Sequence, residues 1–269
     1  MKNKDILKYI VNLDLKKNFY KHGIDKLLKQ RVFKPSSVPK PMETFTNEGG
    51  SQFEPDHSDL TRLYSIIRKR KILTVLEFGS GKSTIIMGEA LKKNNHDYSK
   101  KISLIRRKNP FHIFSLESEK KYARIVKNDC KKMKLEKYVS VKLVNAEQTL
   151  FNNMICGRYK KIPSVCPDLI YIDGPMPMSY KNSRNQYLDM NEPDITNITC
   201  DLLMIEPILL PGTIVIIDGL TNNARFNLRN LKRTWLSHQD LNKDYTVMIL
   251  DEPTLGIHHK NQLLFQNSN

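Results

Sequence analysis

The chain has 269 residues, 39% of them hydrophobic, and a formal net charge of +16. This length is sufficient for one sizeable α/β domain with an added segment. No apolar run approaches the roughly 20 residues that cross a membrane, and charges interrupt the apolar positions at the N-terminus, which excludes a signal peptide. We therefore expect a cytoplasmic protein without a membrane span.

Four cysteines are spread over the chain, at Cys130, Cys156, Cys166 and Cys200. None forms a CxxC pair, so their spacing fits neither a zinc site nor a disulfide framework, and we expect reduced thiols. The positive charge would attract anions such as nucleic acid. Because the lysines are dispersed along a chain rich in Lys, Asn and Ile, a nucleic-acid partner stays open but is not favoured.

The N-terminal part differs in pattern from the rest of the chain. Residues 1–34 have a basic, helical pattern, and residues 34–59 are rich in Pro, Ser and Gly, which predicts a loop or linker. We expect an N-terminal helical extension and linker over 1–59 and the main domain over 60–269.

Helix and strand alternate from residue 60 to residue 240. The predicted helices are 60–70, 83–93, 119–133, 199–209 and 224–236, and the predicted strands are 72–78, 111–117, 139–144, 168–173, 212–218, 245–250 and 261–266. The strands are continuous apolar runs, which is typical of a parallel sheet covered by helices on both faces. The last two strands have no helix between them and are expected to form an antiparallel end to the sheet.

A polar stretch of some two dozen residues, 174–197, interrupts this rhythm after the predicted strand 168–173. Open α/β sheets bind their ligands at the carboxyl ends of strands, so this loop is a candidate for substrate contacts. Its members Tyr180, Arg184 and Tyr187, with Gln186, suit a hydroxylated or anionic small molecule such as a sugar.

A glycine turn, "VLEFGSGKST" at residues 75–84, allows two interpretations. The phosphate-loop pattern GxxxxGK[ST] is half present, because Gly81, Lys82 and Ser83 match its end while Leu76 stands at its first glycine. A phosphate-loop-like nucleotide-binding protein is therefore an alternative. The dinucleotide pattern GxGxxG fits less well, since Thr84 takes the place of its third glycine.

The second interpretation starts from the acidic residue before the two glycines. Glu77-Phe78-Gly79-Ser80-Gly81 resembles the first motif of the class I S-adenosylmethionine-dependent methyltransferases. In that family the glycines let the backbone approach the methionine part of the cofactor, the acidic side chain accepts from its ammonium group, and the helix N-terminus satisfies its carboxylate. The resemblance assigns cofactor binding to Glu77, Gly79, Ser80, Gly81, Ser83 and Thr84.

Later motifs extend the resemblance over roughly residues 60–266. By resemblance, Glu117 holds the ribose hydroxyls with Ser118 beside it, since one carboxylate can accept from both hydroxyls. Asn145 and Ala146 would lie beside the adenine, and Asp173 would face the transferred methyl group. The resemblance implies a Rossmann-like, doubly wound, mostly parallel seven-stranded sheet with an antiparallel last strand, and a methyltransferase-like catalytic domain over 60–269.

The chain departs from the family's pattern in two places. Lys82 is charged where many members have a small residue, and the distance from Gly81 to Glu117 is longer than the roughly 20 residues usual for such units. The excess corresponds to the basic stretch 94–110, which we expect to be a surface insertion. This spacing places the ribose role of Glu117 in question.

The chemistry implied by the resemblance centres on Asp173 and Asp218. Some small-molecule O-methyltransferases bind Mg²⁺ with acids at these two strand ends, and Asn222 would be a suitable third ligand. Without a metal, Asp173 is the candidate general base.

The expected function is methyl transfer from S-adenosylmethionine, with oxygen of a small polar or glycan-type acceptor as the target. The [DNS]-P-P-[YFW] motif of enzymes that methylate amino groups of bases is replaced here by Asp173-Gly174-Pro175-Met176, which disfavours that chemistry. An RNA methyltransferase with another target atom stays an alternative, as does a methyltransferase-like fold that has lost catalysis.

Overall fold

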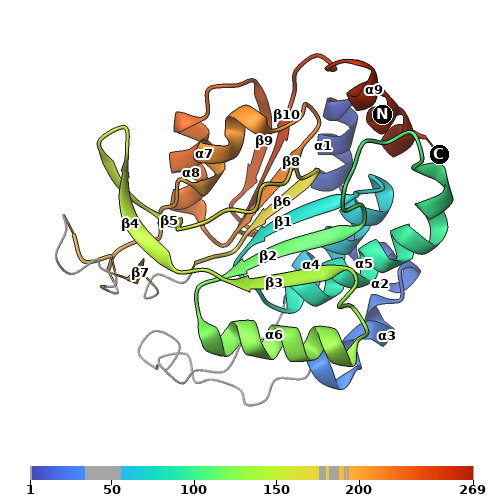
Figure 1. Cartoon of the computed structure of the whole chain (residues 1–269), viewed down its shortest axis with the longest axis horizontal. Coiled ribbons are helices and arrows are strands. Elements are labelled where there is room, and N and C mark those ends of the chain that lie inside the picture. The colour runs from blue at the N-terminus through green and yellow to red at the C-terminus, as the bar shows by residue number, and fades with distance from the viewer. Residues whose placement is uncertain are drawn as a thin grey trace.

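The computed structural model describes residues 2–33, 56–175, 180–181, 188–190, 192 and 194–268. Figure 1 shows a central twisted sheet with helices on both faces and a small second sheet that projects from one end of it. Within the described residues, no helix is long and apolar enough to cross a membrane.

The central sheet has seven strands in the order β3-β2-β1-β6-β8-β10-β9. Their bounds are β1 Thr74–Phe78, β2 His112–Glu117, β3 Val139–Leu143, β6 Leu169–Ile172, β8 Ile214–Asp218, β9 Trp235–Asp240 and β10 Tyr245–Leu250. The first five strands of this order are parallel, and β10 runs antiparallel to both β8 and β9. The predicted mostly parallel seven-stranded sheet with a reversed last strand is confirmed.

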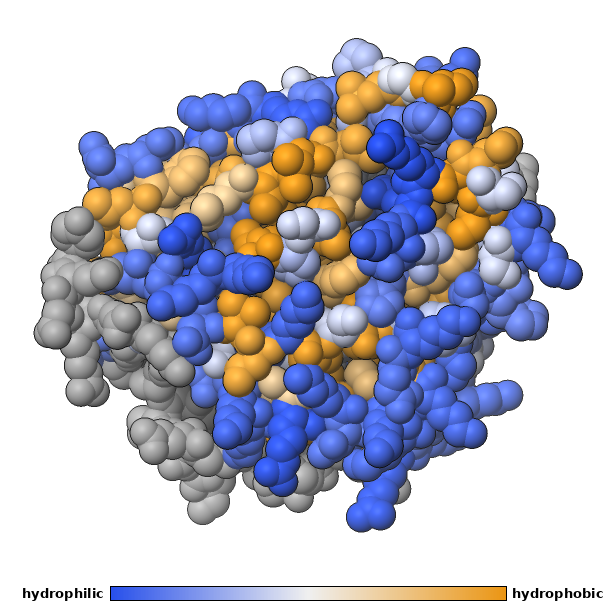
Figure 2. All heavy atoms as spheres, viewed as in Figure 1, coloured by the Kyte–Doolittle hydropathy of each residue, from blue (hydrophilic) through white to orange (hydrophobic). Residues whose placement is uncertain are grey.

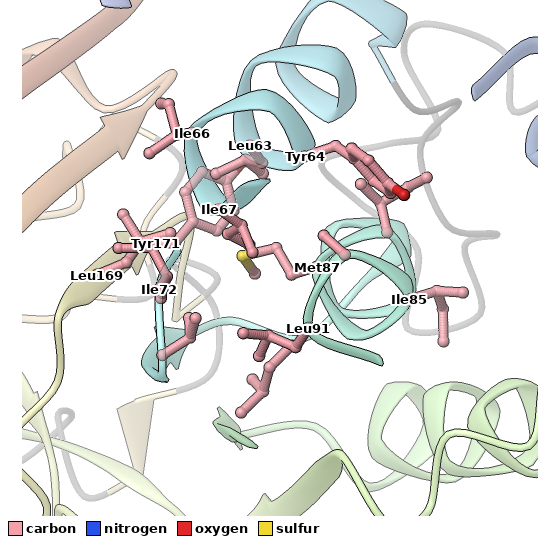
Figure 3. Packing of buried hydrophobic residues seen from close by; sticks show 14 of the residues in the cluster. Leu63, Tyr64, Ile66, Ile67, Ile72, Ile85, Met87, Leu91, Leu169 and Tyr171 are labelled. Carbon is pink, nitrogen blue, oxygen red and sulfur yellow. The ribbon is translucent and has the colours of Figure 1, made fainter. Parts of the chain in front are cut away.

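The strands are buried on both faces because each is a continuous apolar run. Alternate residues of β1 belong to different clusters, with Val75 in one and Leu76 and Phe78 in the other. On one face α4 (His57–Lys69) and α5 (Lys82–Tyr98) pack on the sheet and on each other. Figure 3 shows their side chains meeting Leu169 and Tyr171 of β6. The other face is covered by α7 (Asp201–Ile205), η6 (Glu206–Ile208) and α8 (Thr221–Asn230).

The N-terminal extension is helical, as predicted, and packs against the main domain. It contains α1 (Asn3–Val11), α2 (Leu15–Lys21), α3 (Ile24–Leu28) and η1 (Arg31–Phe33). Ile6, Ile10 and Ile24 are fully buried in the same cluster as the sheet residues on the α4–α5 face. Of the predicted linker, residues 34–55 lie outside the described residues.

Two predictions near the C-terminus are wrong. The expected strand 261–266 is part of helix α9 (Ile257–Asn267), which buries Gln262 and Gln266 and leaves Leu264 exposed. The spacing of apolar residues does not reveal the buried face of this helix, because that face carries glutamines. The Nε2 atom of Gln262 donates to Asp168 over 2.7 Å.

The expected helix 224–236 ends at Asn230, and Trp235 begins β9. The carboxylate of Glu206 ends this helix, because it accepts from the backbone N–H groups of Lys232 and Arg233 and from the indole of Trp235 at 2.8–3.0 Å. The seventh strand of the sheet is therefore β9, in place of the predicted strand 261–266.

One β-hairpin was not predicted from the sequence. Strands β4 (Ala146–Phe151) and β5 (Met154–Tyr159) are joined by Asn152 and Asn153, whose φ angles are 48° and 62°. Two residues with positive φ form the tight turn that matches strand twist, and asparagine tolerates this conformation well. The two-residue β7 (Tyr180–Lys181) pairs with β4 and completes the small sheet.

Helix α6 (Lys120–Lys132) lies on the same face of the sheet as α4 and α5, since its buried residues Ala123, Val126 and Cys130 belong to their cluster. It follows β2 and packs on β3, and the 3-10 turn η3 (Ser99–Lys101) follows α5. Six basic side chains of α6 are exposed: Lys120, Lys121, Arg124, Lys127, Lys131 and Lys132. Figure 2 shows hydrophilic side chains dominating this part of the surface.

Candidate active site

The candidate site lies at the carboxyl edge of the sheet, where β1 and β6 run side by side. A Cβ atom on Gly79, whose φ is +93°, would stand 2.9 Å from the backbone nitrogen of Gly174. A Cβ atom on Gly174 would stand 2.8 Å from the Cα of Gly79. The turns after the two strands thus touch backbone to backbone, and this contact places Asp173 beside the glycine turn.

The backbone N–H groups of the glycine turn donate to protein acceptors. Gly79 donates to the carbonyl of Leu116 over 2.9 Å, and Ser80 to the carboxylate of Glu117 over 3.0 Å. Gly81 donates to the hydroxyl of Thr84 over 3.0 Å. A phosphate loop presents such N–H groups to its anion, whereas here one of them already faces a carboxylate.

Lys82, the lysine of "GKST", points away from the turn. Its Nζ pairs with Asp129 of α6 at 3.0 Å, and only 12% of its side chain is exposed. The pair connects the start of α5 to α6. In a phosphate loop this lysine would reach the phosphates, so the geometry disfavours the nucleotide-binding alternative.

Glu77 lies beneath the glycine turn. It is fully buried and accepts from the hydroxyls of Ser83 over 2.7 Å and Thr84 over 2.6 Å. Burial raises the pKa of Glu77 to about 7, against the lowering effect of hydrogen bonds from Thr84, Ser115 and Ser83. The polar groups of Glu77, Ser83 and Thr84 thus bind one another and shape the turn, and the cofactor roles expected of these residues stay predictions.

Glu117 sits at the glycine turn, where the resemblance placed it. Its carboxylate accepts from the N–H and the hydroxyl of Ser80, at 3.0 and 2.8 Å, and from the N–H of Glu119 at 2.9 Å. Burial raises its pKa. Ser118 beside it is also buried. The ends of β1 and β2 are thereby joined, and the ribose role of Glu117 stays a prediction.

Asn145 and Ala146, which are expected beside the adenine, lie in different environments. Asn145 is half-buried, and its carbonyl accepts from the N–H of Lys160 over 2.9 Å. Ala146 begins β4 and is fully buried against Tyr180 and Met190 in the small sheet. The Ala146 methyl group thus packs in the small sheet and Asn145 keeps access to solvent, while the adenine contact of both residues stays a prediction.

Asp173 is exposed to solvent at the end of β6. Its backbone N–H donates to the carbonyl of Phe78 over 2.9 Å. Neighbouring protein atoms displace part of the water around its carboxyl group, and this dehydration raises its pKa well above the usual value. The negative charges of Asp218, Glu77 and Asp59 raise the pKa of Asp173 further.

Asp218 and Asp59 extend the acidic group around Asp173. Asp218 accepts from the hydroxyl of Tyr171 over 2.6 Å; burial raises its pKa and this hydrogen bond lowers it in part. Asp59 of α4 pairs with Arg62, and burial raises its pKa to about 6. The guanidinium of Arg62 lies 3.8 Å from the ring centre of Tyr245. Sequence reasoning missed Asp59 and Arg62, because no local pattern shows which helix face meets a strand end.

A magnesium site at Asp173 and Asp218, which the resemblance allows, stays a prediction. Among the described residues, no three His, Cys, Asp or Glu side chains are grouped as metal ligands. Asn222, the expected third ligand, donates to the hydroxyl of Thr196 over 2.7 Å. The Asn222 amide is therefore engaged with another side chain in this structure, and no chemical step is assigned to a metal.

The polar loop 174–197 is described at its two ends, and Arg184, Gln186 and Tyr187 lie outside the described residues. Asn197 donates to the carbonyl of Pro175 over 2.5 Å and accepts from the hydroxyl of Tyr180. The Tyr180 ring covers Gly157 so closely that a Cβ atom there would lie 2.1 Å from it. Tyr180 thus joins the loop to the small sheet, and its expected contact with a substrate stays a prediction.

Comparisons with known proteins give remote likenesses. No family model and no curated protein matches the chain. The solved O-methyltransferase TomG of Streptomyces achromogenes, in complex with SAM, is 12% identical over 74% of this chain and 82% of its own, with a TM-score of 0.44. The Podospora anserina methyltransferase PaMTH1, bound to SAH, is 13% identical over 74% and 80%, with a TM-score of 0.47. An O-methyltransferase from Bacillus cereus in complex with SAH is 13% identical over 91% and 96%, with a TM-score of 0.38. At such values the chemistry has to be inferred from this chain's own residues.

Proposed function

We propose that the protein transfers a methyl group from S-adenosylmethionine to an oxygen atom of a small polar or glycan-type acceptor. The observation that carries this proposal is the group of carboxylates at the glycine turn. Glu117 and Asp218, at the ends of β2 and β8, and Glu77 beneath the turn all raise the pKa of Asp173, so acidic groups gather at this edge in a chain of net charge +16.

The charge of the site favours one of the two candidate cofactors. S-adenosylmethionine carries a sulfonium and an ammonium against one carboxylate, so its net charge is positive. ATP carries several negative charges and would meet the carboxylate of Glu117 where a phosphate loop offers free N–H groups. Coulomb energies in a recessed site are large enough to decide between the two.

The cofactor would lie across the turn formed by Gly79, Ser80 and Gly81. Gly81 has open space around its Cα, since a Cβ atom placed on it would stand 3.8 Å from its nearest neighbour, the hydroxyl oxygen of Ser83. The amino-acid part of the cofactor would approach here, toward the N-terminus of α5. Glu117 would accept from the ribose hydroxyls, with the hydroxyl of Ser80 giving up its place on the carboxylate.

Asp173 would act as the general base. The acceptor oxygen attacks the methyl carbon, the carbon–sulfur bond breaks, and the hydroxyl proton passes to the Asp173 carboxylate. The products are a methyl ether, S-adenosylhomocysteine and a protonated Asp173. Because the transfer is a direct displacement, the protein contributes mainly by positioning the reactants. A raised pKa suits a base that works near neutral pH.

An RNA acceptor is the second candidate function, and one observation favours it. The exposed basic face of α6 begins at Lys120, just after Glu117 at the same edge of the sheet. If RNA binds there, the logarithm of its affinity will fall linearly with the logarithm of salt concentration. Equal turnover of small hydroxylated acceptors at low and high salt would instead favour the first proposal.

Calorimetry of the full chain tests the cofactor assignment. We expect micromolar binding of S-adenosylhomocysteine and no binding of ATP with Mg²⁺. Binding of ATP alone would overturn the proposal. If S-adenosylhomocysteine binds, the same protein is screened with hydroxylated acceptors, with Mg²⁺ and with EDTA, and we expect turnover in both because the described acids do not form a metal site.

A further inference from the structure

A cavity lies at the opposite edge of the sheet from the candidate active site. It has a volume of about 530 Å³ and is lined by residues that precede β1 and β8 and follow β10, together with α1 and α9. Small-molecule sites commonly have volumes of roughly 300–1,000 Å³. Nothing in the proposed methyl transfer uses this cavity.

Arg70, at the end of α4, is a buried cation that lines this cavity. Its exposed fraction is 2%, and its guanidinium donates to the side-chain carbonyl of Asn267 in α9. Within the described part of the chain, no carboxylate forms an ion pair with it. A buried charge without a counter-ion is costly, so such groups are normally paired. Burial lowers the pKa of Arg70 to about 10, although Asp168 acts in the opposite direction.

Asp168, the acid that raises the pKa of Arg70, already accepts hydrogen bonds from other donors. Its carboxylate accepts from Arg107 and Gln262 and from the backbone N–H groups of Leu73 and Thr74. Asp168 therefore has little capacity left to neutralise Arg70.

The two acids that line the cavity are engaged as well. Asp251 accepts from the side-chain amide of Asn3 over 3.0 Å. Glu252 forms a two-pronged ion pair with Arg233. At the rim, Lys2, Lys4 and Lys260 are exposed. Arg70 and the three lysines outnumber Asp251 and Glu252, and Glu252 is already paired with Arg233, so the lining keeps an excess of positive charge.

We propose that this cavity binds a phosphate-bearing small molecule, with Arg70 as the buried anchor and Lys2, Lys4 and Lys260 as the rim. A guanidinium forms paired hydrogen bonds with phosphate oxygens, and three lysines around it suit a group that carries two negative charges. The amides of Asn3 and Asn267, which flank Arg70, can donate to or accept from the rest of the ligand.

Calorimetry with pyrophosphate as the probe tests this site on the full chain. We expect binding to the wild type, a loss of about tenfold or more in affinity for Arg70→Gln, and a loss of about two- to threefold for Lys260→Gln. Arg229→Gln removes the same charge from an exposed position of α8 that does not line the cavity, and it should leave the affinity unchanged. Equal losses in Arg70→Gln and Arg229→Gln, or no binding by the wild type, would overturn the proposal.

Three further measurements keep the result unambiguous. Malonate carries two charges on carboxylates, and binding as tight as that of pyrophosphate would overturn the phosphate assignment. The rim variant Lys2→Gln/Lys4→Gln leaves the core untouched, so it should bind pyrophosphate more weakly even if Arg70→Gln is unstable. S-adenosylhomocysteine affinity should be the same in wild type and rim variants, which separates this proposal from the proposed methyl transfer.

Discussion

The two edges of the central sheet carry opposite charge, although they belong to one chain of net charge +16. At the carboxyl edge, Glu77, Glu117, Asp173 and Asp218 gather around the glycine turn. At the other edge, Arg70 is buried among amides beside three exposed lysines. The net charge of the chain thus predicts neither edge, and the ligand each could bind follows from local arrangement.

Charged side chains at both edges form hydrogen bonds with neutral partners. At the acidic edge, hydroxyl groups of Ser83, Thr84 and Tyr171 donate to the carboxylates, and at the other edge Asn267 accepts from Arg70. Neutral partners satisfy hydrogen bonds without cancelling charge. Each edge therefore keeps a field that a ligand of opposite charge would neutralise.

The largest expected effect comes from Asp173→Asn, which removes one charge of the acidic edge and keeps the shape of the side chain. If Asp173 is the base, turnover should fall by about 100- to 10,000-fold. Because the other carboxylates remain, affinity for S-adenosylhomocysteine should change by less than about fivefold. Steady-state kinetics and calorimetry on the same preparation measure the two quantities. Undiminished turnover would remove Asp173 from the chemistry.

Gly79 and Gly81 form a matched pair within the glycine turn. Gly79→Ala forces a side chain into a positive φ and against the backbone of Gly174, and should cost roughly 3 kcal/mol of unfolding free energy. Gly81→Ala meets no such contact and should keep its stability while weakening S-adenosylhomocysteine binding, because its methyl group occupies the cofactor's approach. Chemical denaturation and calorimetry distinguish the two. Equal stability of both variants would contradict the close contact of the turns.

The pH dependence of stability reports on the buried acids. The pKa of Glu77 rises from 4.5 to about 7 in the folded protein, mainly through burial. The folded state therefore binds the proton of Glu77 more tightly than the unfolded state. The unfolding free energy that this adds is fully present below about pH 4 and is lost as the pH rises toward 7. Its size is up to roughly 3 kcal/mol at 1.36 kcal/mol per pKa unit.

Glu77→Gln should flatten the fall in unfolding free energy between about pH 4 and pH 7, measured by denaturant titrations at several pH values. Asp201, whose pKa burial also raises to about 7, lies away from the glycine turn and accepts from the N–H of Tyr159. Asp201→Asn should flatten the same curve without weakening S-adenosylhomocysteine binding. A Glu77→Gln curve parallel to that of the wild type would contradict the raised pKa.

Much of the fold could be predicted from the sequence because the parallel strands are long apolar runs. The errors fall where burial is polar or where the chain is short. Helix α9 buries two glutamines, which an apolar count cannot recognise, and the β4–β5 hairpin was missed although two adjacent asparagines between short runs indicate such a turn.

The sequence predicted where the candidate site lies on the sheet, but not how all of its side chains are oriented. The sequence located the strand ends that carry Glu77, Glu117, Asp173 and Asp218, because parallel strands share one carboxyl edge. It did not show that the Glu77 carboxylate faces Ser83 and Thr84, since the direction of a side chain depends on how the turn closes against Gly174. Asp59 and Arg62 come from a helix whose position on the sheet is set by tertiary packing.

The smallest expected effect separates the two interpretations of "GKST". In a phosphate loop, Lys82→Gln would abolish nucleotide binding, because that lysine contacts the phosphates. Here Lys82 pairs with Asp129, which also has Lys132 at 3.3 Å. The substitution should therefore cost only about 1 kcal/mol of unfolding free energy and leave S-adenosylhomocysteine affinity unchanged. Lys92→Gln, which removes a more exposed lysine paired with Glu89 in the same helix, should cost less than about 0.5 kcal/mol. A large loss of cofactor affinity in Lys82→Gln alone would place this lysine in the site, and the acidic edge would then contain a cation that the present geometry directs toward α6.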